Sequence, residues 1–306
     1  MAQAWQAAVT RAELHQLRTV HAWRAWWSIG LNWAAIAASC WAVVRWPNPL
    51  TVVAALFVIG ARQLGLAILM HDAAHRVLFR SRRLNDVVGN WLCAYPVLSD
   101  LRPYRPYHLQ HHSWNWTADD PDLPLAQPFP ITPASLWRKV WRDLSGQTGW
   151  KRLRATLTRR AAGDATVQRN FDAGREALRG VLITNAALLG AMTLAGHPAL
   201  YLLWAGAWLT TYSLVMRIRS IAEHAVPLDA SDELGNTRTT LATWWERLLI
   251  APNRVNFHLE HHLVPTVPHY HLPRFHRLLR ARGVLDGACV ARGYAAVLAR
   301  ATARAA

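Results

Sequence analysis

Eight of the 15 histidines gather in three short motifs, MHDAAH, YHLQHH and FHLEHH. They are His71, His75, His108, His111, His112, His258, His261 and His262. Residues i, i+3 and i+4 share one side of a helix, so we expect the histidines of each motif to point the same way. Imidazole is a good ligand for iron, copper, nickel and zinc. Because eight converging imidazoles are too many for one metal ion, the motifs predict a dinuclear metal centre.

A ninth candidate ligand is His224 in the stretch RSIAEH, just past the last long apolar segment. The remaining histidines carry a weaker signal. We interpret His15, His21 and His276 as ordinary residues of basic helices, and His197 as part of a loop. His269 and His271 lie among prolines and are left out of the predicted ligand set.

Several carboxylates and amides lie close to the motifs in the sequence. Those adjoining a motif histidine either orient an imidazole through its second nitrogen or are solvated surface groups. They are Asp72, Glu223 and Glu260. Asp119, Asp120 and Asp122 either contact a ligand histidine or cap a helix. Asn253 and Asn256 either hold a water molecule near the metal or stabilise a loop.

Four segments are apolar for about the 20 residues that a membrane-spanning helix needs. They cover residues 26–44, 50–70, 178–195 and 198–216, and PNP and GHP separate the members of each pair. The pattern predicts an all-α integral membrane protein in which four transmembrane helices form two hairpins. We expect residues 1–306 to be one domain whose helical cap holds the metals. A soluble helical bundle is less consistent with segments that are apolar nearly all round.

The charge pattern predicts the orientation. The net charge is +16, and nearly all the basic residues lie before residue 25, in the section 71–177 and after residue 216. Because cytosolic loops carry the excess of Lys and Arg, both termini and the metal centre are expected in the cytosol, at a bacterial inner membrane. Tryptophans at 23, 26, 27 and 46 bracket the first span. We expect Arg62, inside the second span, to form a buried ion pair, and the short apolar segment 87–98 to be interfacial or re-entrant.

Some classes of function are excluded. Cys40, Cys93 and Cys289 are scattered, which argues against a disulfide framework or a thiolate zinc site. The basic residues flank apolar spans and no nucleic-acid motif is present, so nucleic acid is not an expected partner. A basic cytosolic surface suits an acidic, ferredoxin-like electron carrier and suits anionic lipid headgroups equally well.

From about residue 62 to residue 276, the sequence resembles the membrane fatty acid desaturases, whose histidine boxes read HxxxH, HxxHH and HxxHH. The stretches RLNDVVGN, DDPDLP and NFHLEHHLVPTVPHYHLP look like the bacterial branch that includes the rhizobitoxine-type desaturases. The resemblance implies two iron ions held by all nine candidate histidines, with O2 as co-substrate. Since AGHPAL lacks the family's HPGG haem motif, an external electron donor is implied.

The function implied by this resemblance is oxygen-dependent desaturation of an acyl-lipid or acyl-carrier substrate. A hydroxylase or ketolase acting on an acyl chain or a carotenoid is the alternative, because the third motif also resembles those enzymes. A membrane metal-binding or transport protein is the third hypothesis. It is disfavoured because the histidines gather at one end of the spans and not along them, where a metal pathway needs ligands.

Overall fold

The computed structural model describes residues 4–158 and 174–303. Two long antiparallel helices organise it, α3 (Ala22–Arg45) and α4 (Pro49–Ala74). The side chain of Asn48 caps α4 by accepting a hydrogen bond from the backbone N–H of Thr51 at 3.0 Å, and Pro49 supplies the fixed φ that suits a first helical turn. Both helices are long and apolar enough to cross a bilayer.

The second pair of predicted spans is less regular. The segment 178–195 coincides with most of α11 (Gly174–Leu194) and ends one residue beyond it. Residues 198–216 contain α12 (Leu200–Leu209) and the start of α13 (Thr211–His224). The chain breaks at Thr210, where φ is −111° and ψ is −85°. Beyond the break, the hydroxyl of Thr211 donates to the carbonyl of Leu56 at 2.6 Å. The prediction of one continuous fourth span therefore differs from the structure.

The short apolar segment 87–98 folds back against α3 and α4. It contains the end of α5 (Arg82–Val88), the π-helical turn η1 (Gly89–Ala94) and the 3₁₀ turn η2 (Tyr95–Val97). Cys93 and Ala94 are buried in the same apolar cluster as Leu69, whereas Trp91 is exposed. Most of the segment is thus buried in the protein, with only Val87, Trp91 and Leu92 exposed, and its length does not allow it to cross a bilayer.

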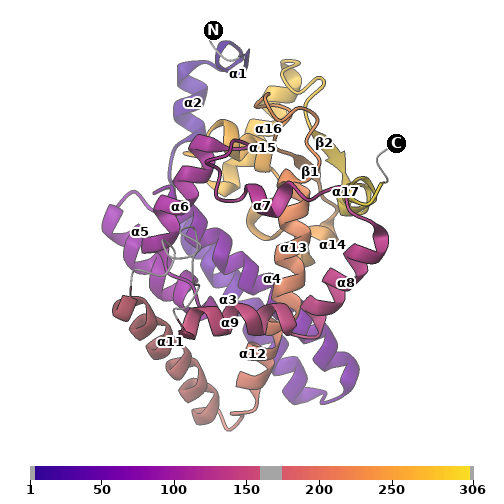
Figure 1. Cartoon of the computed structure of the whole chain (residues 1–306). Helices are drawn as coiled ribbons and strands as arrows, with labels where there is room; N and C mark the ends of the chain where they lie inside the picture. The colour runs from indigo at the N-terminus through magenta and orange to yellow at the C-terminus, as the bar shows by residue number, and fades with distance from the viewer. Residues whose placement is uncertain (1–3, 159–173, 304–306) are drawn as a thin grey trace.

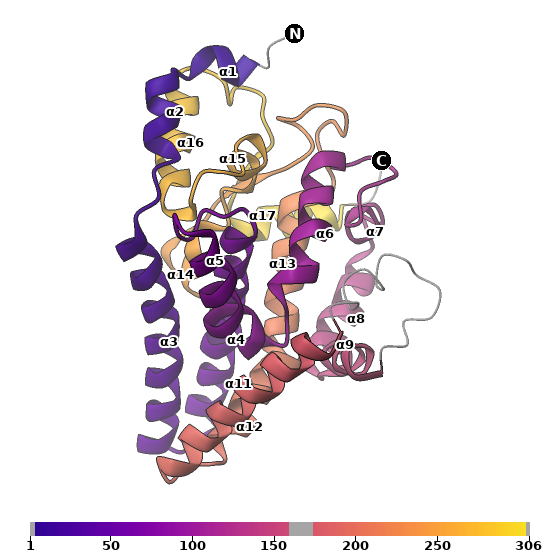
Figure 2. The ribbon, with the colours of Figure 1, turned by 90° about the vertical axis from the view of Figure 1, so that its left-hand side faces the viewer.

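Most of the remaining elements form a second half of the molecule, beyond the cytosolic end predicted for α3 and α4 (Figures 1 and 2). After η2 come α6 (Leu101–Trp114), α7 (Leu123–Ala126), α8 (Pro133–Leu144) and α9 (Gln147–Thr158), of which α9 lies level with α3 and α4. The C-terminal part contains α14 (Trp244–Leu249), η3 (Pro252–Arg254), α15 (His258–Leu263), η4 (His269–His271), α16 (Leu272–Ala281) and α17 (Gly293–Ala301). Helices α1 (Ala4–Ala8) and α2 (Arg11–Leu17) lie at the same end.

Two details correct the sequence analysis. The chain is mostly helical but not wholly so, because β1 (Thr239–Leu241) and β2 (Val290–Arg292) pair in parallel, with Thr240 opposite Ala291. Arg62 is buried, but its partner among the described residues is the backbone carbonyl of Leu248, at the end of α14, and not a carboxylate. The predicted ion pair is therefore wrong. The orphan carbonyls at a helix C-terminus carry partial negative charge and suit a guanidinium.

Candidate metal centre

All nine predicted histidines come together, and they form two groups. The first group consists of His71, His75, His108, His112 and His261, and the second of His111, His224, His258 and His262. Within each group the potential ligand atoms all lie within 4.8 Å of one another. The two groups adjoin, since the rings of His112 and His262 stack with centroids 4.2 Å apart. The arrangement fits a dinuclear centre, while the role of each residue as a ligand stays a prediction.

Each HxxHH motif contributes to both groups. In α6, His108 and His112 belong to the first group and His111 to the second, and in α15 only His261 joins the first group. Side chains at i and i+4 differ by about 40° around a helix, but those at i+3 and i+4 differ by about 100°. The expectation that the histidines of one motif all point the same way is therefore wrong for the two HxxHH motifs, although His71 and His75 of the first motif do share a group. The histidines of each HxxHH motif share one side of the helix but divide between two positions.

The ring nitrogens of the first group are too crowded for an ordinary hydrogen-bond network. The Nε2 atom of His108 lies 2.8 Å from Nε2 of His75 and 3.0 Å from Nε2 of His112. A ring nitrogen offers one N–H or one lone pair, so it cannot satisfy two such neighbours. If two nitrogens bind one metal ion with metal–nitrogen bonds of about 2.1 Å, the value for zinc, and an N–metal–N angle of about 90°, they lie about 3.0 Å apart. The spacing fits lone pairs directed at a shared cation.

Burial keeps these imidazoles in the neutral form that binds metals. Removal from water lowers the pKa of seven of them well below the ordinary value, and neighbouring histidines lower it further. The seven are His75, His108, His112, His224, His258, His261 and His262. Within the described chain, both ring nitrogens of His71 and Nε2 of His262 have no hydrogen-bond partner. Unpaired buried nitrogens are costly unless a metal binds them, so the residues present fit two metal ions.

The second nitrogen of His111 is held by a carboxylate. Its Nδ1 atom lies 2.8 Å from Oδ1 of Asp120, a buried residue that also accepts the backbone N–H of Trp116 at 3.0 Å. Such a contact fixes the proton on Nδ1 and turns Nε2 towards the centre. Of the three aspartates considered in this stretch, Asp120 contacts a motif histidine, Asp119 is exposed, and Asp122 accepts a hydrogen bond from the Tyr107 hydroxyl.

His269 and His276, which are outside the predicted ligand set, support the centre from outside. The buried Nδ1 of His269 lies 2.7 Å from Oδ2 of Asp72, next to His71, and Nε2 lies 3.0 Å from the hydroxyl of Ser28. The interpretation of His276 as an ordinary residue of a basic helix is wrong. It is buried, and its Nδ1 lies 2.6 Å from Oε1 of Glu260. These pairs tie α4 and α15 to their neighbours. The sequence features that could have indicated these pairs are a carboxylate next to a motif histidine and a further histidine downstream of the third motif.

The other flagged residues have distinct roles. Glu223 receives a hydrogen bond from Nε of Arg219 at 2.5 Å and lies 3.5 Å from Nδ1 of His258. Burial raises the pKa of Glu223 to about 7, although Arg219 opposes the shift. The side-chain amides of Asn253 and Asn256 donate to backbone carbonyls, those of Gly65 and Thr240, which is the loop role considered for them.

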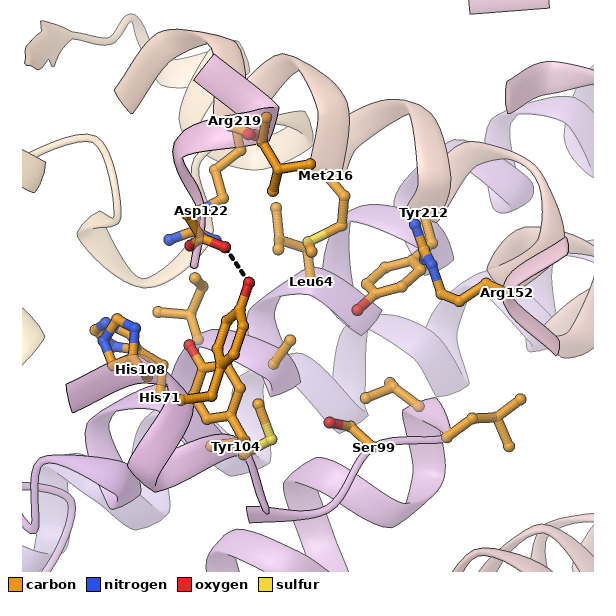
Figure 3. A pocket seen from close by; sticks show the side chains of 18 of the residues that line it. Leu64, His71, Ser99, Tyr104, His108, Asp122, Arg152, Tyr212, Met216 and Arg219 are labelled. Carbon is orange, nitrogen blue, oxygen red and sulfur yellow. Dashed lines mark hydrogen bonds between the residues drawn. The ribbon is translucent and has the colours of Figure 1, made fainter. Parts of the chain in front are cut away.

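A cavity of about 470 Å³ adjoins both histidine groups (Figure 3). His71 and His108 of the first group lie at one side of it and Arg152 lies at the other, over the rings of Trp208 and Tyr212 (Figure 3). Leu64 and Met216 lie between (Figure 3). His111, His224 and His258 of the second group also line the cavity. Its volume falls in the range of small-molecule sites, which are mostly apolar with a few polar groups. An apolar chain in this cavity would lie beside the metal centre.

Comparison with known proteins agrees with the histidine pattern. The model of the fatty acid desaturase family matches residues 47–291. Dihydrorhizobitoxine desaturase of Bradyrhizobium elkanii is 28% identical over 262 residues, which is 82% of this chain and 73% of the relative.

Two further relatives act on lipids by name. The sn-1 oleoyl-lipid 12-desaturase of Picosynechococcus sp. is 23% identical over 81% of this chain and 74% of its own length. The chloroplastic omega-6 fatty acid desaturase of Arabidopsis thaliana is 24% identical over 80% of this chain, and the match covers 55% of that protein. The resemblance seen in the sequence is confirmed.

Proposed function

Because the chain belongs to the fatty acid desaturase family and is an oxidoreductase, we propose that it is an oxygen-dependent acyl desaturase with two iron ions. The observation that carries this proposal is the position of the apolar cavity against both histidine groups. Five histidines would hold one iron and four the other. The remaining parts of the proposal are that residues 1–306 form one domain and that the spans lie in a bacterial inner membrane, with the centre and both termini cytosolic.

The bound irons would supply the activation of O2 needed to attack a C–H bond that no side chain can attack. The overall reaction removes two hydrogens from the substrate, takes two electrons and two protons, and reduces O2 to two waters. The chain's own contribution is position and exclusion of water. Leu64 and Met216 line the cavity with apolar surface, and Asp120 holds His111 in a single orientation.

Two electrons must come from outside, and an acidic, ferredoxin-like carrier is the proposed donor. The net charge of +16 favours association with such a protein, since complementary charge speeds encounter. The substrate proposed is a lipid or acyl chain. Hydroxylation on the same scaffold differs from desaturation only in product, so the test is designed to separate the two.

The experiment is mass spectrometry of total lipids from cells that express the chain with a ferredoxin and its reductase. A species two hydrogens lighter, present with the wild type and absent with His261→Ala, is expected. The matched control is His197→Ala, which changes an exposed histidine in the loop after α11 and should keep full activity. A species that gains one oxygen would reassign the chain as a hydroxylase. Equal lipid profiles for wild type and His261→Ala would contradict an acyl substrate made by that host.

A further inference from the structure

Helix α8 carries an apolar stripe that no part of the described protein covers. Trp137 and Trp141 are 71% and 68% exposed, and Leu144 continues the line at the spacing i, i+4, i+7. On α9, Trp150 is 59% exposed. We refer to these four residues as the tryptophan face. Soluble proteins rarely leave so many large apolar side chains together in water, so the face indicates an interaction site.

Cations flank the tryptophan face. Arg138 and Arg142 are exposed on α8, and Lys151 is exposed on α9. The only acidic residue of the two helices is Asp143, which is buried and accepts a hydrogen bond from Nε of Arg217 at 2.5 Å. Burial lowers the pKa of Lys139, and the guanidiniums of Arg217 and Arg142 lower it further. The surface around the face is therefore positive, and an anionic partner would relieve its internal repulsion.

The opposite side of the two helices is fixed to the protein. Leu136 and Leu153 pack on the main apolar core. A Cβ atom at Gly149 would lie 2.3 Å from the carbonyl oxygen of Leu209, so α9 rests directly on the backbone where α12 ends. In Figure 2, α9 lies beside the end of α11 nearest the histidine-bearing half. The tryptophan face is thus held rigidly at the boundary between the apolar helices and the second half of the molecule.

We propose that α8 and α9 lie in the headgroup layer of the membrane, where the tryptophan face enters the lipid and Arg138, Arg142 and Lys151 bind anionic headgroups. An amphipathic helix with Trp and Leu on one side and Lys or Arg beside them is typical of this location. Trp favours the interface because its ring prefers lipid while its N–H stays hydrated. The inference rests on the membrane location in the proposed function, to which it adds a specific surface and a class of lipid.

A bilayer fits this surface better than a protein partner does. Exposed tryptophans also occur at the start of α3, where Trp23 is 63% and Trp27 is 67% exposed, and on α14, where Trp244 is 72% exposed. Several separate elements therefore present aromatic rings to the surroundings, as an interfacial belt does. A single carrier protein would need one compact interface, commonly of about 800 Å² per partner.

The test uses the full chain in lipid nanodiscs, with a nitroxide spin label on Trp141→Cys or on Trp137→Cys. The native cysteines are buried, and unlabelled wild type measures their background. Collision with oxygen, which enters lipid, is compared with collision with a water-soluble nickel chelate. Both labels are expected at headgroup depth, protected from nickel. The matched control is a label on Asp286→Cys, on the exposed segment after α16, which should collide freely with the nickel chelate. Equal nickel access at 141 and 286 would overturn the proposal.

The charge requirement is tested in the same nanodiscs with mixed phosphatidylglycerol and phosphatidylcholine. The double variant Arg138→Gln with Arg142→Gln should lower the preference for phosphatidylglycerol by roughly fivefold for each charge removed. No change in this preference would contradict the role given to the cations. If the labels become protected only when an acidic ferredoxin is added, the face is a protein site and the lipid proposal is wrong. The depth of the labels is measured without turnover, so the same experiment can be done in the inactive His261→Ala variant. Labels at headgroup depth in that variant would support the lipid proposal even if the desaturase proposal failed.

Discussion

At the scale of single residues, the centre depends on how each imidazole is turned. His111 owes its orientation to Asp120 at 2.8 Å, whereas His71 lies 3.6 Å from the nearest oxygen of Asp72, which is too long for a hydrogen bond. Asp72 instead holds His269. The carboxylates next to the motifs therefore divide into one class that contacts a candidate ligand and another that fixes the helix carrying it.

Loss of one histidine from either group is predicted to abolish activity. His111→Ala removes a residue of the second group and His261→Ala one of the first. Because each deletion leaves a cavity of neutral imidazoles with one donor fewer, we expect bound iron to fall while the protein still inserts in membranes. Iron per chain in purified protein and the distribution between membrane and soluble fractions measure these two effects. Full activity in both variants would contradict the dinuclear assignment.

The contact between Asp120 and His111 predicts a graded effect. Asp120→Asn keeps the shape but weakens the acceptor for the imidazole N–H, so metal affinity should fall by roughly 10–100-fold. Asp119→Asn, at the exposed neighbouring position, is the matched control and should leave affinity unchanged. Competition with a chelator of known affinity gives both values. Equal affinities for the two variants would show that Asp120 has no orienting role.

At the scale of elements, close backbone contacts determine how the helices approach the centre. Helix α13 carries His224 at its end, and it starts at a break in the chain at Thr210, where Thr211 packs on α4 at Gly60. Similarly, α9 lies on the end of α12 because Gly149 has no side chain. These contacts set the positions of helices that line the cavity, so small substitutions at them should act on both stability and substrate binding.

Gly149→Ala is predicted to destabilise the protein. Its Cβ atom would lie 2.3 Å from the carbonyl oxygen of Leu209, and overpacking of this kind costs about 1–3 kcal/mol. The control is Gly190→Ala in α11, where no atom lies within 4 Å of the new Cβ and the helix should be unchanged or up to about 1 kcal/mol more stable. Thermal unfolding in detergent compares the two. A lower melting temperature for Gly190→Ala than for Gly149→Ala would refute the packing argument.

At the scale of the whole molecule, the centre joins elements far apart in the sequence. The nine histidines come from the α4, α6, α13 and α15 regions, and the terminal helices are tied together as well. Glu13 of α2 and Arg282, just after α16, form an ion pair of 2.6 Å. Metal binding and this pairing should each stabilise the fold by linking distant parts of the chain.

Removal of the metal is predicted to lower the melting temperature. A ligand that binds only the folded state stabilises it in proportion to the logarithm of its concentration over its dissociation constant. Chelation should therefore reduce stability in the wild type and have much less effect in His111→Ala, which is expected to bind metal poorly. Differential scanning calorimetry with and without chelator tests this difference. If the melting temperature of the wild type is unchanged by the chelator, metal binding at the centre is contradicted.

The Glu13–Arg282 pair predicts a local effect of pH. Hydrogen bonds from Arg282 and Thr10 lower the pKa of Glu13 from its ordinary 4.5 to about 2. Since the folded pKa lies below the unfolded one, this stabilisation is complete above pH 4.5 and is lost as the pH falls towards 2. Hydrogen exchange in α2 should therefore accelerate over that range, relative to the rest of the chain. Glu13→Gln should exchange faster at neutral pH and show little further change on acidification.

The histidine motifs, the ninth histidine and the family could be read from the sequence, because metal ligation requires particular residue types at helical spacing. Two apolar spans were also evident, since length and hydropathy are local properties. The same local reasoning failed for His276, because nothing in its own surroundings in the sequence shows that Glu260 would be buried beside it.

What only the tertiary structure decided was the assignment of histidines to two positions, the break at Thr210 and the partner of Arg62. A helical motif fixes the angles between its own side chains, but not which neighbours they meet. His108 and His111 are three residues apart, yet they join different groups because α4 approaches one and α13 the other. The sequence therefore identified the histidines that could bind metal, and packing between distant helices determined how these candidate ligands divide into two groups.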